Sequence, residues 1–311
     1  MAFDVIKVND RIRKDPTGFI EECESIFDKR VSEAAQKIAD NSQNHRVVLL
    51  SGPSGSGKTT TAMKISQKLD KLGVGTRPVS LDDYFRTVNP ETAPKTESGE
   101  IDYESPKCLD MKLLNKHIED IADGREIFIP KFDFKTQSRS ETVRPLCLGK
   151  NEVVIFEGIH ALNDEITQAA GEKAIKLYIS ARSNFYSDGE LFYKGTWTRL
   201  ARRIVRDNNF RHANSDFTLK IWEGIRRGEK KYISPFKDRA DIIINSTHEY
   251  EMNLLRDHLL NAVSGVPKEI ERYDEVCRML ERTKQFEGVS DKLVPKDSLL
   301  REFIGGGTFS Y

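Results

Sequence analysis

The stretch SGPSGSGKTT at residues 51–60 has the glycine, lysine and threonine spacing that binds nucleotide phosphates. It matches the pattern G-x-x-x-x-G-K-[ST]. In this pattern glycines let backbone N–H groups approach the phosphates, the lysine reaches the outer phosphates, and the threonine hydroxyl binds Mg²⁺. We therefore predict a triphosphate site made by Gly52, Ser54, Gly55, Ser56, Gly57, Lys58, Thr59 and Thr60.

Two acidic positions are placed for metal and proton chemistry. Asp82 lies in SLDDYF, just after an expected strand, and Glu157 ends the apolar run VVIFEG. The carboxyl ends of parallel strands meet at one edge of a sheet, where ligands bind. Asp82 suits proton acceptance or a Mg²⁺ water, and Glu157 suits Mg²⁺ through water. The alternatives are a turn cap for Asp82 or Asp83 and a surface acid for Glu157.

An arginine cluster lies in TRLARRIVRDNNFR, residues 198–211. On a helix, Arg199, Arg203 and Arg206 share one face. Such a cluster suits a lid that closes on a triphosphate, and a solvated basic helix face is the alternative. We predict an Arg-rich lid over about residues 183–235.

The segments that would position these residues alternate between strands and helices. Strands are expected at residues 46–52, 76–81, 126–130, 152–158, 174–180 and 240–246, and helices at 59–73, 110–123 and 197–208. Most of the strand segments are apolar runs without alternation, as in a parallel sheet covered on both faces. This order predicts an α/β fold with a doubly wound parallel sheet of the P-loop kinase type.

Both ends of the chain have helical patterns. We expect an N-terminal helical extension at 1–45, a P-loop kinase domain at 46–246, and a C-terminal helical extension and tail at 247–311. The GGG near the end suggests a flexible tail, although the preceding LLREFI can dock.

The composition narrows the class of protein. Lys plus Arg and Asp plus Glu each number 49, so nothing indicates nucleic acid or a membrane as the main partner. The four cysteines form no CxxC pair and are interpreted as reduced thiols. No apolar run approaches the roughly 20 residues that span a bilayer, and the N-terminus lacks a signal-peptide core. We expect a cytoplasmic protein with a small-molecule substrate, and a homo-oligomer is left open.

Other nucleotide-binding classes fit less well. A GTP switch needs N-K-x-D, and the nearest match, Asn115-Lys116-His117-Ile118, lacks the Asp. The L-S-G-G-Q signature of transporter ATPases is absent. A small-molecule kinase, which needs a base, Mg²⁺-binding acids and mobile cations, is therefore favoured over a regulatory P-loop NTP-binding protein.

Six blocks, taken in order, resemble one family. They are SGPSGSGKTT, SLDDYF, IDYESPKCLD, IPKFDFKTQSR, VVIFEGI and TRLARRIVRD, within residues 46–246. The set resembles the uridine–cytidine kinases, relatives of phosphoribulokinase, and the arrangement of both ends is similar to a bacterial branch of nucleoside kinases. The resemblance implies ATP·Mg²⁺-dependent phosphorylation of the 5′-hydroxyl of uridine or cytidine.

The resemblance also implies roles for individual residues. The implied catalytic residues are Asp82, Lys58, Arg206 and Arg211. The implied Mg²⁺ ligands are Thr59, Asp82 and Glu157. The implied substrate-binding residues are Tyr84, Glu104, Phe132, Phe134, Gln137, Arg139 and Arg203.

The substrate set departs from the family pattern. The family usually has Asp at Glu104, Tyr at Phe132 and His at Gln137, and an expected arginine is replaced by Ala213. Residues 183–195 resemble an insertion ahead of the lid. The acceptor therefore stays open between a pyrimidine ribonucleoside and another polyhydroxylated molecule such as a sugar, polyol or sugar phosphate.

The residues themselves are compatible with a nucleoside. Phe132 and Phe134 alternate along an extended FDF stretch, so both rings can face one side and stack on a base, with a core position as the alternative. The Gln137 amide can pair with uracil or cytosine by turning over. Glu104 offers the two acceptors that vicinal hydroxyls require.

Overall fold

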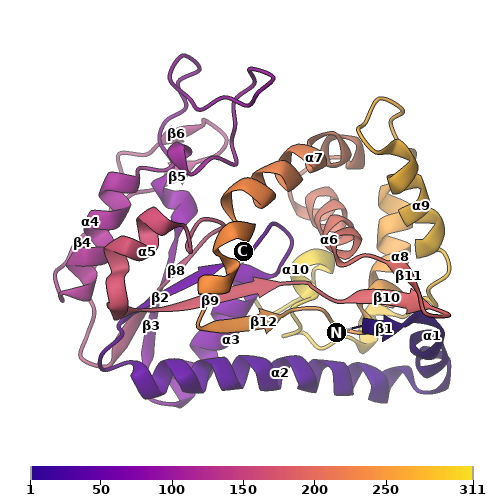
Figure 1. Cartoon of the computed structure of the whole chain (residues 1–311). Coiled ribbons are helices and arrows are strands. Elements are labelled where there is room, and N and C mark those ends of the chain that lie inside the picture. Colours follow the sequence, from indigo (N-terminus) through magenta and orange to yellow (C-terminus); the bar gives the residue numbers. More distant parts are fainter. Residues whose placement is uncertain (1, 310–311) are drawn as a thin grey trace.

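A computed structural model of the chain describes residues 2–309; residues 1, 310 and 311, which belong to the expected end segments, lie outside it (Figure 1). Five strands form one parallel sheet in the order β12-β9-β2-β8-β3. They are β2 (Val47–Ser51), β3 (Gly75–Ser80), β8 (Glu152–Glu157), β9 (Ala174–Ser180) and β12 (Ile242–Asn245). The predicted α/β fold with a parallel sheet is confirmed.

The helices surround this sheet. They are α1 (Val5–Lys14), α2 (Pro16–Asn41), α3 (Lys58–Lys71), α4 (Met111–Ala122), α5 (Asp164–Ala170), α6 (Gly195–Phe210), α7 (Ser215–Tyr232), α8 (Glu251–Ala262), α9 (Tyr273–Thr283) and α10 (Arg301–Ile304). Short 3₁₀ turns are η1 (Leu81–Tyr84), η2 (Pro106–Cys108), η3 (Gly171–Lys173), η4 (Ser234–Arg239) and η5 (Asp291–Leu293). The helices expected at 59–73, 110–123 and 197–208 correspond to α3, α4 and α6.

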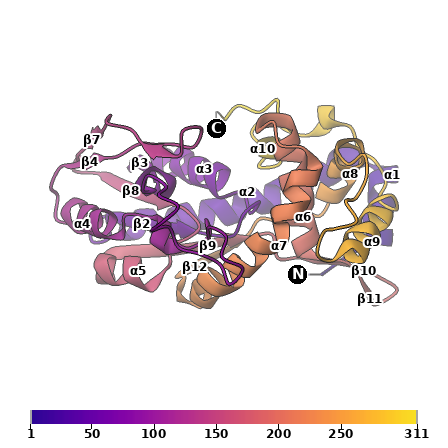
Figure 2. The same ribbon diagram turned by 90° about the horizontal axis from the view of Figure 1, so that it is seen from above.

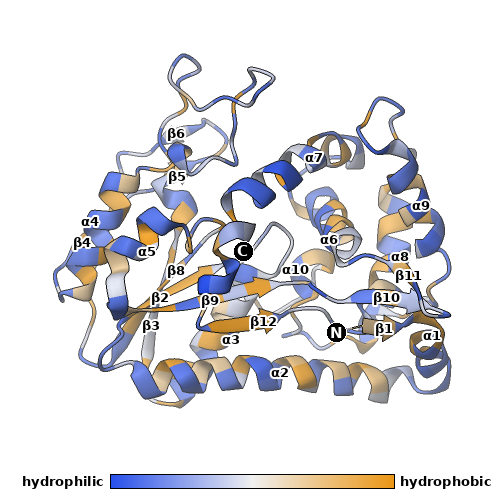
Figure 3. Cartoon of the chain, viewed as in Figure 1, coloured by the Kyte–Doolittle hydropathy of each residue, from blue (hydrophilic) through white to orange (hydrophobic). Residues whose placement is uncertain are grey.

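Alternate side chains of β2 point into two cores, one on each face of the sheet. Val48 and Leu50 pack with side chains of α2, α3, α6 and α8. Val47 and Leu49 pack with side chains of α4 and α5. All four side chains are fully buried, which explains why this strand is an unbroken apolar run. Figure 3 shows apolar residues concentrated along these central strands.

One expected strand lies outside the main sheet. Residues 126–130 form β4 (Ile127–Ile129), which pairs antiparallel with β7 (Arg144–Leu146). Ile127 and Ile129 are buried, whereas Phe128 is 52% exposed. This alternation is typical of a two-stranded ribbon with one solvent-exposed face, so the expected strand is present but does not belong to the parallel sheet. A second small hairpin joins β5 (Phe132–Asp133) to β6 (Ser138–Arg139).

The N-terminal segment contains a strand as well as the expected helices. β1 (Ala2–Asp4) pairs parallel with β10 (Asn184–Ser187), which pairs antiparallel with β11 (Glu190–Tyr193). The segment 183–195 thus supplies two strands of a three-stranded sheet, and the N-terminus supplies the third. α2 runs along the α3 face of the main sheet (Figure 1).

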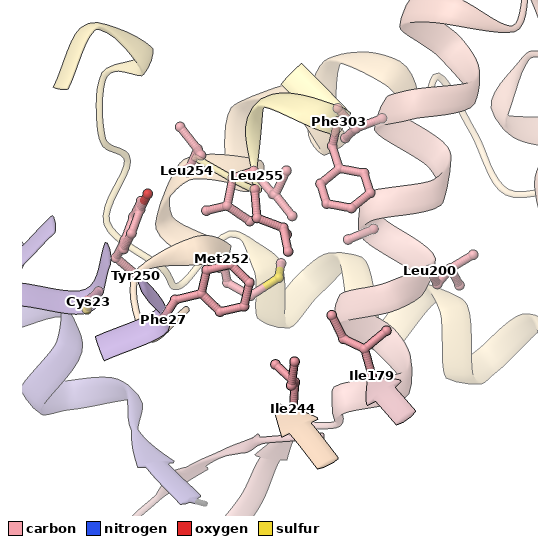
Figure 4. Close-up of a cluster of buried hydrophobic side chains, with 14 of the residues drawn as sticks. Cys23, Phe27, Ile179, Leu200, Ile244, Tyr250, Met252, Leu254, Leu255 and Phe303 are labelled. Carbon is pink, nitrogen blue, oxygen red and sulfur yellow. The ribbon is translucent and has the colours of Figure 1, made fainter. Parts of the chain in front are cut away.

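The C-terminal tail is docked. Leu299, Leu300 and Phe303 are fully buried, so the LLREFI stretch packs into the molecule, and Gly306, Gly307 and Thr308 after it are exposed. Figure 4 shows Phe303 pointing toward Leu254 and Leu255 of α8. Among residues 2–309, no helix combines the length and apolar character needed to cross a membrane.

Candidate active site

The glycine loop connects β2 to α3 at the carboxyl edge of the sheet. Gly55 and Gly57 have φ of 73° and 83°, in the left-handed region that favours glycine. A Cβ on Gly52 would lie 2.1 Å from the carbonyl oxygen of Ile179, so only glycine fits there. The loop therefore wraps closely enough to present backbone N–H groups to phosphates, at the N-terminus of a 14-residue helix.

Lys58 lies among the acidic candidates. Its Nζ donates to the Pro53 carbonyl oxygen at 3.2 Å. Burial lowers the pKa of Lys58, while the charges of Glu157 and Asp82 oppose that change. The structure thus places the predicted lysine within electrostatic reach of both predicted acids.

Oxygen ligands suited to Mg²⁺ gather at the ends of β2, β3 and β8. Thr59 Oγ1 and Ser80 Oγ each lie 3.5 Å from Glu157 Oε1. Burial raises the pKa of Glu157 to about 7, although Lys58 pulls it down. Asp82 extends from η1 and is exposed. Hydroxyl and carboxylate oxygens are the donors that Mg²⁺ prefers, so these residues fit that ion together with phosphate oxygens.

Three arginines of the α6 region share one buried carboxylate. Asp207 is 3% exposed and lies 2.7 Å from Arg206, 3.2 Å from Arg203 and 3.8 Å from Arg211. Arg203 Nη1 also donates to Ser54 Oγ at 2.6 Å. Asp207 therefore holds these arginines beside the phosphate loop. Its role was not predicted, although it is the sole acid within the basic run.

The other arginines of the cluster are buried supports. Arg199 is 2% exposed, contacts Glu229 at 2.9 Å and donates to the Ser54 carbonyl oxygen at 3.2 Å. Arg202 is fully buried, donates to the Gly55 carbonyl oxygen at 3.2 Å and is paired with Glu251. The alternative of a solvated basic face is thus wrong. Arg199 is also not a mobile lid residue, although the helix face that it shares with Arg203 and Arg206 had suggested that role. Their acidic partners lie far away in sequence, which hid this role.

Glu104, which is expected to bind the acceptor, lies between β3 and α4 along the chain. It packs against α7, where a Cβ on Gly228 would be 2.3 Å from the Glu104 Cβ. Burial raises the pKa of Glu104 to about 7, while Arg203 and Lys58 pull it down. The same segment is anchored by a hydrogen bond of 2.9 Å from the Tyr232 hydroxyl to Asp102 Oδ2.

Phe132 and Phe134 meet a third ring that the sequence interpretation missed. Their ring centroids are 5.0 Å apart, and Phe85 lies 5.5 Å from Phe132 and 5.8 Å from Phe134. Phe132 is buried, whereas Phe134 is 61% exposed. Gln137 occupies the β5–β6 turn with φ of 51° and an exposed side chain. The two predicted rings therefore share a side, while Gln137 is not enclosed with them.

Tyr84 and Arg139 hold the loops together. The Tyr84 ring is fully buried and its hydroxyl lies 3.0 Å from His117 Nδ1. Arg139 binds Asp110 at 3.1 Å and donates to the carbonyl oxygens of Tyr84 and Phe85. Both side chains therefore have structural contacts, although Arg139 Nε is buried without a hydrogen-bond partner, and their implied substrate contact stays a prediction.

Comparisons with known proteins agree with this geometry. Residues 47–253 match the model of the phosphoribulokinase / uridine kinase family. Uridine-cytidine kinase B of Dictyostelium discoideum is 28% identical over 228 residues, covering 72% of this chain and 85% of that protein. A uridine kinase of Ureaplasma urealyticum is 25% identical over 222 residues, covering 71% of this chain and 96% of that protein.

A solved structure described as a possible uridine kinase from Bacillus stearothermophilus is also similar. It has a TM-score of 0.46 and 18% identity, with 70% of this chain and 97% of that chain covered. The family match spans all five strands of the parallel sheet, the phosphate loop and α6, the arginine helix. The chain is therefore a P-loop kinase that belongs to the phosphoribulokinase/uridine kinase family.

Proposed function

We propose that the protein transfers the γ-phosphoryl group of ATP to the 5′-hydroxyl of uridine or cytidine. The observation that carries this proposal is the position of Glu104, a carboxylate within electrostatic reach of both Lys58 and Arg203. Such a carboxylate is suited to bind hydroxyls close to the residues that we propose for phosphate binding. The names of the curated relatives, which are uridine and uridine–cytidine kinases, support a pyrimidine nucleoside as the acceptor.

The chemistry divides between the two sides of the site. Backbone N–H groups of the glycine loop bind the phosphates, and Lys58 meets the outer phosphates. Asp82 accepts the proton of the attacking hydroxyl. Thr59, Asp82 and Glu157 would hold Mg²⁺, which would supply positive charge to the transferring phosphoryl group.

The arginines of α6 and Arg211 just after it act on the phosphate side of the site. Arg206 and Arg211 stabilise the transferring phosphoryl group, and Arg203 contacts the substrate. Asp207 holds all three arginines beside the phosphate loop.

On the acceptor side, Glu104 accepts hydrogen bonds from the ribose hydroxyls. Phe132 and Phe134 stack on the base, and Gln137 pairs with its polar edge.

A second acceptor class is favoured by one observation. Gln137 and Phe134 are exposed, so the residues proposed for the base do not enclose a slot, whereas Glu104 is within electrostatic reach of Lys58. A hydroxyl-binding carboxylate without an enclosed base slot also suits a sugar, polyol or sugar phosphate.

The test is ADP release from the purified protein with ATP·Mg²⁺ and a panel of acceptors. Uridine and cytidine should both be phosphorylated, and purine nucleosides and deoxyuridine should be poor. Lys58→Ala protein, purified in parallel, controls for contaminating kinases. Release with a sugar or polyol alone would replace the nucleoside assignment. ATP binding without release for any acceptor would favour a regulatory NTP-binding protein.

A further inference from the structure

The C-terminal segment Asp297–Gly305 lies between the helix of the phosphate loop and the arginine helix. It includes α10, which packs against α6 (Figure 2). Its apolar side chains Leu299, Leu300 and Phe303 are fully buried. Undocking would expose all three, so the segment is a fixed part of the molecule rather than a plug that leaves in each cycle.

On one side the segment follows a single face of α3. Lys64 Nζ donates to the Asp297 carbonyl oxygen at 2.7 Å, and the Thr60 hydroxyl donates to Glu302 Oε2 at 2.5 Å. A Cβ on Gly57 would lie 2.6 Å from Leu299 Cδ1. Positions three and four apart lie on one helix face, so the segment contacts the first two turns of α3 from one direction.

On the other side the segment contacts α6. The Arg202 guanidinium lies 5.1 Å from the Phe303 ring centroid, and Asn209 Nδ2 donates to the Phe303 carbonyl oxygen at 3.1 Å. Arg202 also donates to the carbonyl oxygen of Gly55 in the phosphate loop. One arginine therefore joins the tail, the arginine helix and the phosphate loop.

We propose that Asp297–Gly305 sets the spacing between the phosphate loop and the arginine helix, and that Glu302 is a positioning residue for the nucleotide site. Phosphoryl transfer depends on positioning and electrostatics, so Lys58 and Arg206 must be held at a defined separation. Glu302 fixes the Thr60 hydroxyl one turn into α3 and places a carboxylate near the positive end of that helix. This role goes beyond the proposed function because it does not depend on the acceptor.

The first test compares Glu302→Ala with Glu302→Gln. Glutamine retains an oxygen that can accept from Thr60, whereas alanine does not. We expect Glu302→Ala to lower kcat/KM for ATP about tenfold and Glu302→Gln to stay within about threefold of wild type. The KM for the acceptor should be unchanged in both. Glu281→Ala, which removes an exposed acid of α9, is the matched control.

Direct ATP·Mg²⁺ titration by calorimetry separates this proposal from the acceptor assignment, because binding needs no acceptor. Two outcomes would overturn it. If Glu302→Ala binds ATP and turns over as the wild type does, Glu302 does not position the nucleotide site. Tighter ATP binding by both variants would instead show that the carboxylate repels the phosphates and acts as an inhibitory contact.

A double-mutant cycle tests the bond itself. Thr60→Val combined with Glu302→Ala should weaken ATP binding no more than Thr60→Val alone, because both changes remove one interaction. Additive losses would mean that the two residues act independently. Thermal unfolding of each variant identifies any loss of ATP binding that is caused by misfolding. Thr60→Ser keeps the hydroxyl and should therefore bind ATP more tightly than Thr60→Val does.

Discussion

At the scale of single residues, Asp82 and Asp83 are adjacent acids with different surroundings. Asp82 is the acid in electrostatic reach of Lys58 and Glu157. Asp83 instead has Lys131 and Arg144 as its charged neighbours. This difference favours Asp82 as the base that takes the proton from the hydroxyl that receives the phosphoryl group.

Asp82→Asn keeps the size of the side chain and removes the proton acceptor. We expect kcat to fall about 10²–10⁴-fold while ATP binding is largely retained. Steady-state kinetics with parallel Mg²⁺ titrations measures both effects. Asp83→Asn is the matched variant. A fall in kcat for Asp83→Asn but not for Asp82→Asn would show that Asp83, and not Asp82, is the base.

Glu104 predicts a pH dependence of acceptor binding. Burial raises the pKa of Glu104 to about 7, so the carboxylate is protonated below that pH and ionised above it. The ionised form accepts from two hydroxyls, so the KM for the acceptor should fall as pH rises from about 6 to about 8. Glu104→Gln should abolish this change, and an unchanged profile would show that Glu104 does not bind the acceptor.

At the scale of elements, α6 carries two kinds of arginine. Arg203 and Arg206 surround Asp207 at the phosphate site, whereas Arg199 and Arg202 are buried against acids of α7 and α8. The two kinds should respond differently to substitution, the first in catalysis and the second in stability.

Arg206→Ala and Arg211→Ala should each lower kcat about 10- to 1000-fold and change the acceptor KM less. Arginines that contact the transferring group act mainly in the transition state. Arg227→Ala on α7 is the control, because Arg227 is exposed and pairs with Glu271 at the surface. Wild-type kinetics for both Arg206→Ala and Arg211→Ala would show that neither arginine acts in the transfer.

The buried pair Arg202–Glu251 ties α6 to α8. Both side chains are fully buried, so Glu251→Ala leaves an uncompensated charge and should lower the free energy of unfolding by about 3–5 kcal/mol. Arg202→Met combined with Glu251→Leu should lose less. Urea denaturation measures the change, with Glu281→Ala as an exposed control expected within about 0.5 kcal/mol. Equal, small losses for all variants would contradict a stabilising pair.

At the scale of the whole molecule, the two end segments share a core with the kinase sheet. Phe27 of α2, Leu50 of β2, Leu255 of α8 and Phe303 of α10 belong to one cluster of buried side chains. Figure 4 shows Phe27, Leu255 and Phe303 around the strand residues Ile179 and Ile244. The boundaries at residues 45 and 246 stay predictions, but this packing links the segments on both sides of each.

A shared core predicts one cooperative unfolding transition for the whole chain. Trp197 and Trp222 report on α6 and α7 by fluorescence, while far-ultraviolet circular dichroism reports on all helices, including α2 and α8. The midpoints in urea should coincide. Loss of helix signal before the fluorescence change would indicate that 1–45 or 247–311 unfolds independently.

The local features were predictable from sequence because they depend on neighbours along the chain. The glycine loop follows a buried strand and begins a helix, and short-range steric requirements define that arrangement. The apolar runs of β2, β8 and β9 likewise indicated a parallel sheet, because strands that are buried on both faces consist mostly of consecutive apolar residues. The order of the motifs predicted that Lys58, Asp82 and Glu157 lie within electrostatic reach of one another at the sheet edge, whereas their roles in catalysis stay predictions.

The remaining features depend on partners distant in sequence. Arg199 and Arg202 have the same side chain as Arg203 and Arg206, and only Glu229 and Glu251 make them buried supports. Likewise β1 pairs with β10, and the docked tail depends on α3 and α6. The sequence alone therefore determined the phosphate loop and the parallel sheet, whereas the tertiary structure decided which charged groups are buried, because burial and pairing arise only when distant segments pack together.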